Sequence, residues 1–508
     1  MKRRDFFLCL FLFALGILSR LPLIEKMQSH MDGPTYSIAL VNYSFEQDNP
    51  TAPGYPLYIG LGKVLLSFTG DPHVALLLVS VLFSGIGAVL FYLVGRAMYS
   101  RISGIISSVF FLSSPAIFFF GLTPYGYIVV LVMTTLLAWI VFEISFHKKQ
   151  FGLLLGAMYA ISLGVRPQEA MLTLPLFLFG IFYLKSTEII RAAIAFIAVF
   201  FLWFLPFSLL TGGIPHLFEA MALASRSALS SPSVTYFLRK KFELGSGFFL
   251  TLGLSGMVLF IGFLSVASQY LKSQSLTTRQ IRFIVFSIVW FLPPLLFNLF
   301  VRTEHAGYQF DYLIYFMFFV SLFLARYFRN HPILIQCIVA TLVLTNLLIF
   351  FYDRDPQRER PYRQTSLHYS DIRRNDYELS TKIKYITLHY SPRDAIIFSS
   401  TPFWKQYMYH LPKYAVYSLD GFFSSDKRYA SLVRYGHEWK RIAYTVPSLQ
   451  MTIPKGTRTL ILLDTDSCLW SPQGATKIHF PQNTCITNIP VKNNRFFKFG
   501  YHTIKLLS

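Results

Sequence analysis

The sequence predicts a polytopic α-helical membrane protein of about eleven transmembrane helices with a C-terminal extracytoplasmic α/β domain. Hydrophobic residues make up 54% of the 508 positions and charged residues only 14%, and 52 residues are Phe. An ordinary soluble core cannot bury this much apolar surface. Long apolar runs recur as far as about residue 350, and shorter, more charged and alternating segments follow them. These observations together predict a membrane domain followed by a soluble one.

The predicted spans are apolar runs of roughly 17 to 25 residues, which is the length that crosses a hydrocarbon core as a helix. They begin at Phe6, Val74, Ser103, Tyr127, Ile189, Phe248, Phe283, Phe310 and Ile333. Two shorter runs, 151–164 and 170–184, are separated by the polar stretch 165–169. We interpret this pair as two short spans that meet at a polar turn.

Positive charges predict the orientation, because Lys and Arg near span ends stay on the cytoplasmic side. With the N-terminus inside, fourteen Lys and Arg fall on cytoplasmic segments and nine on the longer opposite segments. We therefore expect a cytoplasmic N-terminus and an extracytoplasmic C-terminal domain. A compact soluble domain after the last span is typical of a bacterial envelope protein, so we expect a multi-pass protein of the bacterial inner (plasma) membrane, with the endoplasmic reticulum as the alternative that the sequence leaves open.

The domain boundary is predicted at the change in character near residue 353. Residues 1–352 form the expected membrane domain, with a first external loop at 25–73, and 353–508 form the soluble domain. Strand-like stretches at 395–399 and 459–464 and helical stretches at 371–388 and 403–410 indicate an α/β arrangement. From residue 353 onward, 23 Lys and Arg face 12 Asp and Glu, a net +11. This charge fits contact with lipid headgroups or with an anionic acceptor.

The four cysteines are too few for a disulfide scaffold. Cys468 and Cys485 lie in the external domain, where an oxidising compartment favours a disulfide between them. The sequence contains no Cys/His cluster with zinc spacing, no phosphate-binding Walker loop and no dinucleotide fingerprint. We expect no nucleotide cofactor and no nucleic-acid partner, and the sequence marks no metal-ligating residues, although a divalent metal is possible.

The unusual polar residues all fall on the predicted outer face, in the external loops around Asp32, Arg166 and Arg302. Transporters more often place ionisable groups inside spans near the midplane. The first external loop combines a carboxylate, Asp32, with a stiff segment at 51–58 that reads Thr-Ala-Pro-Gly-Tyr-Pro-Leu-Tyr. A one-sided site at the water edge of a membrane suits an enzyme with a lipid-borne substrate.

These residues resemble the membrane-embedded glycosyltransferases of the C superfamily, with a layout like that of protein mannosyltransferases and aminoarabinose transferases. The resemblance covers most of the chain. Pro53 to Tyr58 is similar to the His-Pro-Pro-Gly-Tyr-Pro-Leu-Tyr motif of a subgroup that includes protein O-mannosyltransferase-like proteins. Thr51-Ala52 replaces the His-Pro, and Gly33 follows Asp32 where the mannosyltransferases usually have a second acid. The second departure leaves a divalent metal requirement open.

The resemblance implies transfer of one sugar from a polyprenyl- or dolichyl-phosphate carrier to an outer-side acceptor, with inversion at the anomeric carbon. A carboxylate within hydrogen-bond reach can take the proton of an acceptor hydroxyl, and Asp32 is the candidate general base. Asp32 is also placed to cap a helix, because Pro34 and a helix-compatible stretch follow it. The two roles are compatible if the capped helix holds the carboxylate in place.

The leaving group in such a reaction is a lipid phosphate, so fixed cations are expected near it. The candidate phosphate- and substrate-binding residues are Arg166, Lys63, Arg302, His305, Tyr55 and Tyr58, with Glu169 and Glu304 as residues that orient the arginines. Arg166 is the best shaped of these because an Arg fork binds phosphate in bidentate fashion and Pro167 restricts its backbone. The alternatives are headgroup contacts for the cations and an interfacial aromatic belt for the tyrosines.

Two other function classes fit a polytopic membrane protein. A lipid-linked saccharide transporter or flippase would carry polar groups inside its spans and a two-fold internal repeat, and neither is evident. A non-catalytic envelope scaffold would need no carboxylate at position 32. The expected partners are a polyprenyl-phosphate-linked sugar, membrane lipids, and a lipid, glycan or protein acceptor. The sequence identifies neither the sugar nor the acceptor.

Overall fold

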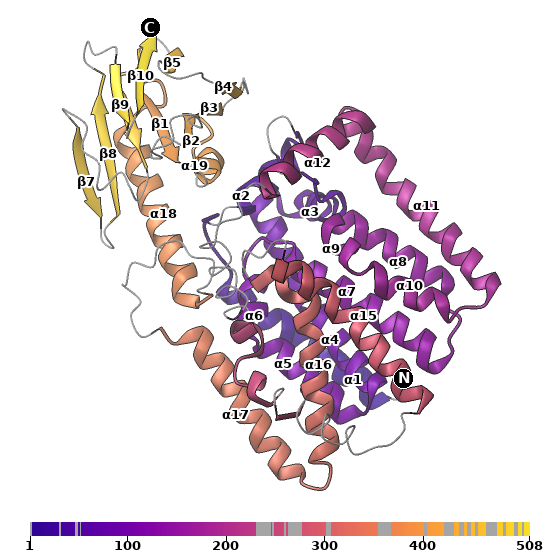
Figure 1. Ribbon diagram of the computed structural model, residues 1–508. Coiled ribbons are helices and arrows are strands. Elements are labelled where there is room, and N and C mark those ends of the chain that lie inside the picture. Colours follow the sequence, from indigo (N-terminus) through magenta and orange to yellow (C-terminus); the bar gives the residue numbers. More distant parts are fainter. Residues whose placement is uncertain are drawn as a thin grey trace. The chain divides into compact units, whose positions relative to one another are not determined.

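The fold is taken from a computed structural model of the whole chain (Figure 1). The residues that the structure describes are 3–29, 32–45, 49–50, 52–229, 245, 248–258, 261–262, 277–300, 306–353, 367–400, 404–420, 431–435, 441–443, 449–452, 456–463, 475–480, 484–491, 496–499 and 502–507. They divide into two compact units. Unit 1 is helical and contains the described residues of Met1–Glu25, Ala39–Arg354 and Tyr362–Asp371. Unit 2 contains those of Lys26–Ile38 and Ile372–Ser508.

Helices account for the regular structure of unit 1. In chain order they are α1 (Arg3–Leu18), η1 (Leu21–Leu23), α2 (Asp32–Val41), α3 (Pro56–Thr69), α4 (Pro72–Met98), α5 (Arg101–Ser113), α6 (Pro115–Gly121), α7 (Tyr127–His147), α8 (Gly152–Val165), α9 (Pro167–Leu172), α10 (Leu174–Phe182), α11 (Ser186–Leu210), α12 (Ile214–Leu229), α15 (Thr278–Phe300), η2 (Ala306–Gln309), α16 (Phe310–Tyr327) and α17 (Pro332–Phe351). Helix α2 begins in unit 2 and ends in unit 1.

Seven of the described helical segments are long and apolar enough to cross a membrane, and α5 with α6 forms an eighth if the pair, bent by 62°, counts as one span. This is consistent with a polytopic membrane protein. The expected count of about eleven spans is not confirmed. The predicted short runs became α8, α9 and α10, and most of the run from Phe248 lies outside the described residues.

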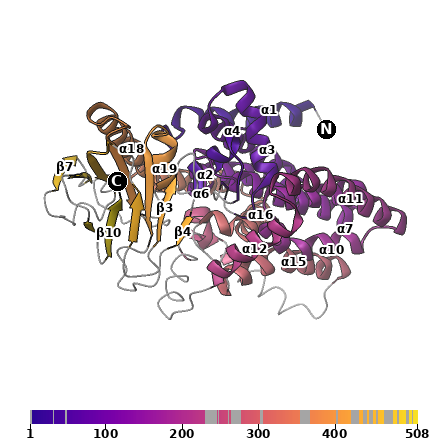
Figure 2. The same cartoon turned by 90° about the horizontal axis from the view of Figure 1, so that it is seen from above.

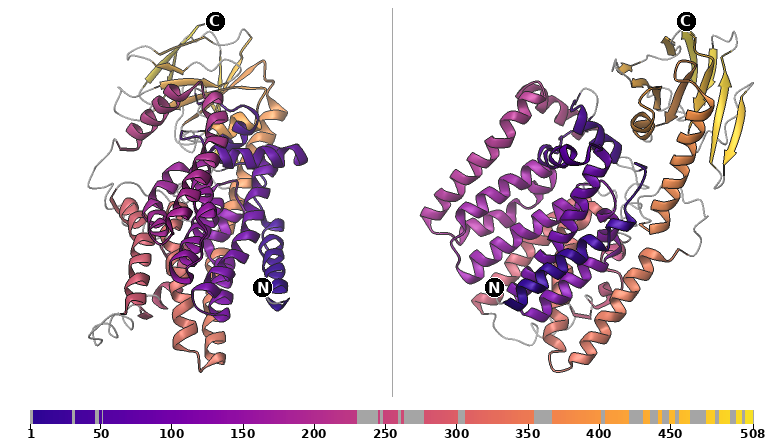
Figure 3. Two further views of the ribbon diagram at one scale, coloured as in Figure 1. Left: turned by 90° about the vertical axis from the view of Figure 1, so that its right-hand side faces the viewer. Right: turned by 180° about the vertical axis from the view of Figure 1, so that it is seen from behind.

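The helices of unit 1 lie side by side (Figure 3). Among the seven candidate spans, those that contain α4, α7 and α16 are the most buried. Helices α11 and α17 instead expose large apolar side chains, such as Leu202 and Ile333, as helices that face lipid do. Helix α8 packs closely on α11 because Gly152 and Gly156 carry no side chain: a Cβ at Gly156 would lie 1.9 Å from the carbonyl oxygen of Ala192. Small residues at such spacing allow two membrane helices to approach closely.

Unit 2 is an α/β domain, in agreement with the class that the sequence predicts. Its elements are α18 (Tyr369–His389), which starts in unit 1, β1 (Ala395–Ser400), α19 (Trp404–His410), β2 (Ala415–Asp420), β3 (Ser431–Tyr435), β4 (Arg441–Ala443), β5 (Leu449–Thr452), β6 (Thr459–Leu462), β7 (Thr476–Phe480), β8 (Thr484–Pro490), β9 (Phe496–Phe499) and β10 (His502–Leu507). The described strands form a seven-stranded sheet in the order β4-β3-β2-β1-β6-β8-β7 and a three-stranded sheet in the order β5-β10-β9.

Strand β1 lies at the centre of the larger sheet and pairs in parallel with β2 and β6. Alternate residues Ala395 and Ile397 of β1 pack in one core with Leu379 of α18 and Tyr407 of α19. Both helices therefore cover the same face of the sheet (Figure 2). The partly buried side chain of Met27 also packs against this core, although it lies far away in sequence.

The division into units differs from the predicted domains in two respects, because the described residues of Tyr362–Asp371 belong to unit 1 and Lys26–Ile38 belongs to unit 2. The segment Lys26–Ile38 was expected in the first external loop of the membrane domain, and the structure makes it part of unit 2. Lys26–Ile38 belongs to unit 2 because its backbone and Met27 contact α18, α19 and the core of the C-terminal domain. A boundary drawn from composition cannot detect such a contact between distant parts of a chain.

Candidate functional site

Arg166 occupies the break between α8 and α9 in unit 1. It has an extended backbone (φ −155°, ψ 93°), as expected for a residue before proline, and Pro167 is the first residue of α9. The side chain is buried, with 4% of the residue exposed. The polar turn predicted between two short helices is thus present, and it places a guanidinium inside the unit.

Tyrosine rings surround the guanidinium of Arg166. Its central carbon lies 4.3 Å from the ring centre of Tyr127, 4.6 Å from that of Tyr308 and 5.6 Å from that of Tyr55. An Arg nitrogen also donates a hydrogen bond of 3.4 Å to the Tyr127 hydroxyl. Cation–π attraction increases when the cation is desolvated, so these rings hold the charge in a fixed place.

Gly307 allows the Tyr127 ring to approach. A Cβ at Gly307 would lie 2.7 Å from the ring, closer than real contacts permit. Tyr308 follows Gly307 in η2, so the short helix supplies both the space for one ring and the second ring.

Tyr55 reaches Arg166 from the segment that precedes α3. Its backbone is left-handed (φ 47°, ψ 50°), and Pro56 starts the helix. Left-handed conformations are uncommon for residues with a side chain and are found at functional sites. The Tyr55 hydroxyl accepts a hydrogen bond of 3.2 Å from Gln168 of α9, and the Tyr43 hydroxyl donates one of 2.8 Å to the carbonyl of Gly54. The side chains of Gln168 in α9 and of Tyr43, just after α2, therefore hold this segment.

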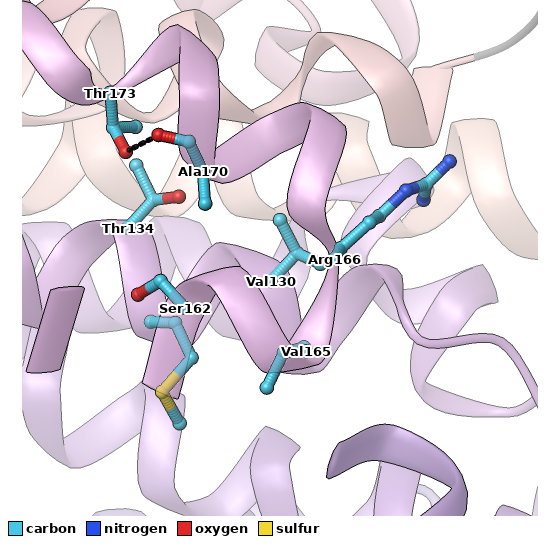
Figure 4. Close-up of a pocket in the computed structure, with 8 residues that line it drawn as sticks. Val130, Thr134, Ser162, Val165, Arg166, Ala170 and Thr173 are labelled. Carbon is cyan, nitrogen blue, oxygen red and sulfur yellow. Dashed lines mark hydrogen bonds between the residues drawn. The ribbon is translucent and has the colours of Figure 1, made fainter. Parts of the chain in front are cut away.

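A small cavity lies at the base of the Arg166 side chain. Its volume is about 10 Å³, roughly the space that a single water molecule needs. Its lining residues are Val130, Met133, Thr134, Ser162, Val165, Arg166, Ala170 and Thr173. The guanidinium points away from the hydroxyls of Thr134, Ser162 and Thr173 (Figure 4).

A buried carboxylate lies behind the cavity wall. Thr134 lines the cavity and donates a hydrogen bond of 2.8 Å to Oδ1 of Asp311. Asp311 is in the first turn of α16 and only 1% of it is exposed. Acidic groups within apolar helices are costly and mark functional positions. Unit 1 thus contains a buried cation, Arg166, and a buried carboxylate, Asp311.

Solved structures share this architecture at low sequence identity. No protein-family model matches the chain, and no curated protein does. The structure of ArnT from Cupriavidus metallidurans bound to undecaprenyl phosphate is 9% identical, with a TM-score of 0.54 over 95% of this chain and 97% of that one. Its apo state gives a TM-score of 0.53 at the same identity and coverage. The Archaeoglobus fulgidus oligosaccharyltransferase in complex with Zn and sulfate is 10% identical, with a TM-score of 0.52 over 94% of this chain and 72% of that one.

ArnT, an aminoarabinose transferase, and the archaeal oligosaccharyltransferase are both glycosyltransferases of the C superfamily. This chain shares the fold of these two structures. The resemblance found in the residues of the first loop is thereby confirmed for the fold. At 9% to 10% identity the likeness concerns the arrangement of the chain alone.

Asp32 is the first residue of α2 and lies in its first turn with Gly33 and Pro34. The residue is partly exposed and belongs to unit 2. Arg166 and Tyr55 lie together in unit 1. Tyr58 is a buried residue of α3, and Lys63 is an exposed residue of the same helix.

The remaining predicted residues are described only in part. Arg302, Glu304, His305 and Cys468 lie outside the described residues, and the side chain of Glu169 does too. Cys485 is buried in β8 and is disulfide-bonded. Among the residues that the structure does describe, no group of three His, Cys, Asp or Glu is placed to hold a metal ion.

Sequence reasoning did not select Tyr127, Tyr308 or Asp311 as site residues. Asp311 gives the clearest signal, because it is an acid directly before a long apolar run. Tyr127 and Tyr308 are aromatic residues at the starts of predicted helices, where an interfacial belt explains them equally well. Only their distances to Arg166 distinguish the two interpretations.

Proposed function

We propose that the protein is a membrane glycosyltransferase that moves a single sugar from a polyprenyl-phosphate carrier to an extracytoplasmic acceptor, with inversion. The observation that carries this proposal is the buried Arg166 guanidinium, held among the rings of Tyr127, Tyr308 and Tyr55. The C-superfamily fold supports it, and the undecaprenyl phosphate bound to ArnT supports a polyprenyl-linked donor.

The proposed role of Arg166 is to bind the phosphate that leaves. As the bond between the anomeric carbon and the phosphate oxygen breaks, negative charge develops on the phosphate. A planar guanidinium donates two parallel hydrogen bonds to such a group, and the low dielectric of a buried site strengthens them. The tyrosine rings keep the guanidinium in place before the donor binds, so little ordering is needed during the reaction.

The proposed role of Asp32 is that of the general base. The acceptor hydroxyl oxygen attacks the anomeric carbon from the side opposite the phosphate, which inverts that centre. The phosphate leaves with the bonding electron pair, and the carboxylate of Asp32 takes the hydroxyl proton. The start of α2 fixes the backbone of Asp32, and the helix N-terminus favours the ionised carboxylate.

The test measures release of free polyprenyl phosphate from a panel of polyprenyl-phosphate sugars by purified protein, with membrane extract as the acceptor source. Wild type is expected to release polyprenyl phosphate from at least one donor, and Asp32→Asn is expected to lose roughly 10²-fold to 10⁴-fold of that rate. Asp311→Asn is the comparison variant. It makes the same change at a second carboxylate, and Asn keeps an acceptor oxygen for Thr134.

Each outcome assigns a different role. Full activity of Asp32→Asn together with an inactive, folded Asp311→Asn would transfer the role of base to Asp311. Full activity of both variants would refute a carboxylate base in either helix. Movement of intact donor across a vesicle membrane, without release of polyprenyl phosphate by wild type, would identify a flippase instead.

A further inference from the structure

The segment between η1 and α2 is bound by the C-terminal domain. The carboxylate of Asp376, on α18, accepts hydrogen bonds from the backbone N–H of Lys26 at 3.0 Å (Oδ1) and 3.1 Å (Oδ2) and from that of Met27 at 2.8 Å. Asp376 is 6% exposed and is also paired with Arg373 at 3.2 Å. Hydrogen bonds to an ionised acceptor are about twice as strong as neutral ones.

A second helix of the domain holds the next residue. Nε2 of His410, the last residue of α19, accepts a hydrogen bond of 3.1 Å from the backbone N–H of Gln28. A ring nitrogen that accepts must carry no proton, so the bond requires a neutral imidazole with its proton on Nδ1. The side chain of Met27, which lies between Lys26 and Gln28 in sequence, packs against the core that contains Leu379 and Tyr407. Three consecutive residues are therefore fixed by two helices and by an apolar contact.

A further hydrogen bond links this segment to α2. The amide of Gln28 hydrogen-bonds the hydroxyl of Ser37, and both residues are fully buried. Asp32 lies between these two residues in sequence and starts the helix on which Ser37 sits. The chain around Asp32 is thus tied down before the helix, at Lys26–Gln28, and again one turn into it.

We propose that Asp376 and His410 are positioning residues for the transfer reaction: they hold Lys26–Gln28, and through it the Asp32 end of α2, in the reactive geometry. The inference rests on the proposed function of Asp32. A catalytic group must be held within about 0.5 Å of its productive position, and an error of about 1 Å can cost 10²-fold in rate. Asp376 and His410 act through the backbone of the segment and need not touch the substrate.

The experiment compares full-length variants in the polyprenyl phosphate release assay. Asp376→Asn places an amide N–H against the backbone N–H of Lys26, and His410→Ala removes an acceptor. Each is expected to lower kcat roughly tenfold to a hundredfold with the donor KM unchanged. His410→Gln keeps an acceptor oxygen and is expected to retain most of the rate. Glu378→Gln, which removes a charge from the same helix, is the control and is expected to match wild type.

Trypsin cleavage after Lys26 measures, independently of activity, how firmly the C-terminal domain binds the Lys26–Gln28 backbone. The Lys26 side chain is exposed, whereas its backbone N–H is hydrogen-bonded. Cleavage is expected to be slow in wild type and faster in Asp376→Asn and His410→Ala. Faster cleavage with unchanged kcat would overturn the positioning role and leave the proposed function intact. A loss of kcat proportional to the loss of folded protein would also overturn it, since that is a purely structural effect. No release of polyprenyl phosphate by wild type would instead refute the proposed function, and the positioning role with it.

Discussion

Replacement of Arg166 tests the site most directly. In Arg166→Gln the charge is lost, and with it the donors expected to face the leaving phosphate. Loss of one preorganised donor at a developing oxyanion costs about 2.7 to 4 kcal/mol, or 10²-fold to 10³-fold in kcat. Arg166→Lys keeps the charge but loses the planar fork. The rings of Tyr127 and Tyr308, at 4.3 Å and 4.6 Å, each contribute roughly 1 to 2 kcal/mol toward holding a desolvated guanidinium.

Release of polyprenyl phosphate under saturating donor is the assay, and expected rates rank wild type above Arg166→Lys, with Arg166→Gln lowest. Arg20 provides a matched control. It is fully buried in unit 1, and its guanidinium lies 4.3 Å from the ring centre of Phe118. Arg20→Lys is expected to lower thermal stability and to leave the kcat of the folded fraction unchanged.

The reasoning on Arg166 would be refuted by Arg166→Gln with a kcat within threefold of wild type. It would also be refuted if Arg20→Lys lost as much kcat per folded molecule as Arg166→Gln, because burial of any arginine would then explain the effect.

Three further predictions follow from the contacts. Tyr127→Phe keeps the ring beneath Arg166 and removes only a long hydrogen bond, so we expect less than about threefold loss of kcat, whereas Tyr127→Leu should lose more than tenfold. Gly156→Leu should force α8 from α11 and lower the melting temperature in detergent, while Gly60→Leu, with nothing within 4 Å of the added Cβ, should not. Cys485→Ser removes a buried disulfide and should cost unit 2 about 2 to 5 kcal/mol of stability, measured by thermal unfolding, with no further loss on addition of reductant.

The sequence predicts individual helices and strands of this fold better than the number of membrane spans or the contacts between distant segments. The helical stretches at 371–388 and 403–410 correspond to α18 and α19, and the strand at 395–399 corresponds to β1. These succeed because apolar periodicity and local turn residues determine them. The count of about eleven spans is not confirmed among the described residues, where the predicted runs at 151–164 and 170–184 form helices as short as α10 and one run forms the bent pair α5 with α6. Hydropathy measures length and polarity, but not whether a run stays straight.

The candidate site was predictable where a single residue has a strong local signal. Arg166 before proline and Tyr55 before proline are of this kind, and they lie together. Asp376 and His410 were not predictable, because an acid on a charged helix and a histidine at a helix end are common surface residues. Their role depends on a contact with residues about 350 positions earlier in the chain, which no local pattern encodes.

The same contact has a consequence for biosynthesis. The segment Lys26–Gln28 leaves the ribosome early, and its partner Asp376 is made 350 residues later. At translation rates of roughly 5 to 20 residues per second, the interval is on the order of tens of seconds. During that time the backbone N–H groups of the segment have no Asp376 to bind, and Met27 has no C-terminal core to pack against. The binding of this segment therefore cannot be completed until the chain is almost fully synthesised, so truncation within the C-terminal domain would affect both ends of the protein.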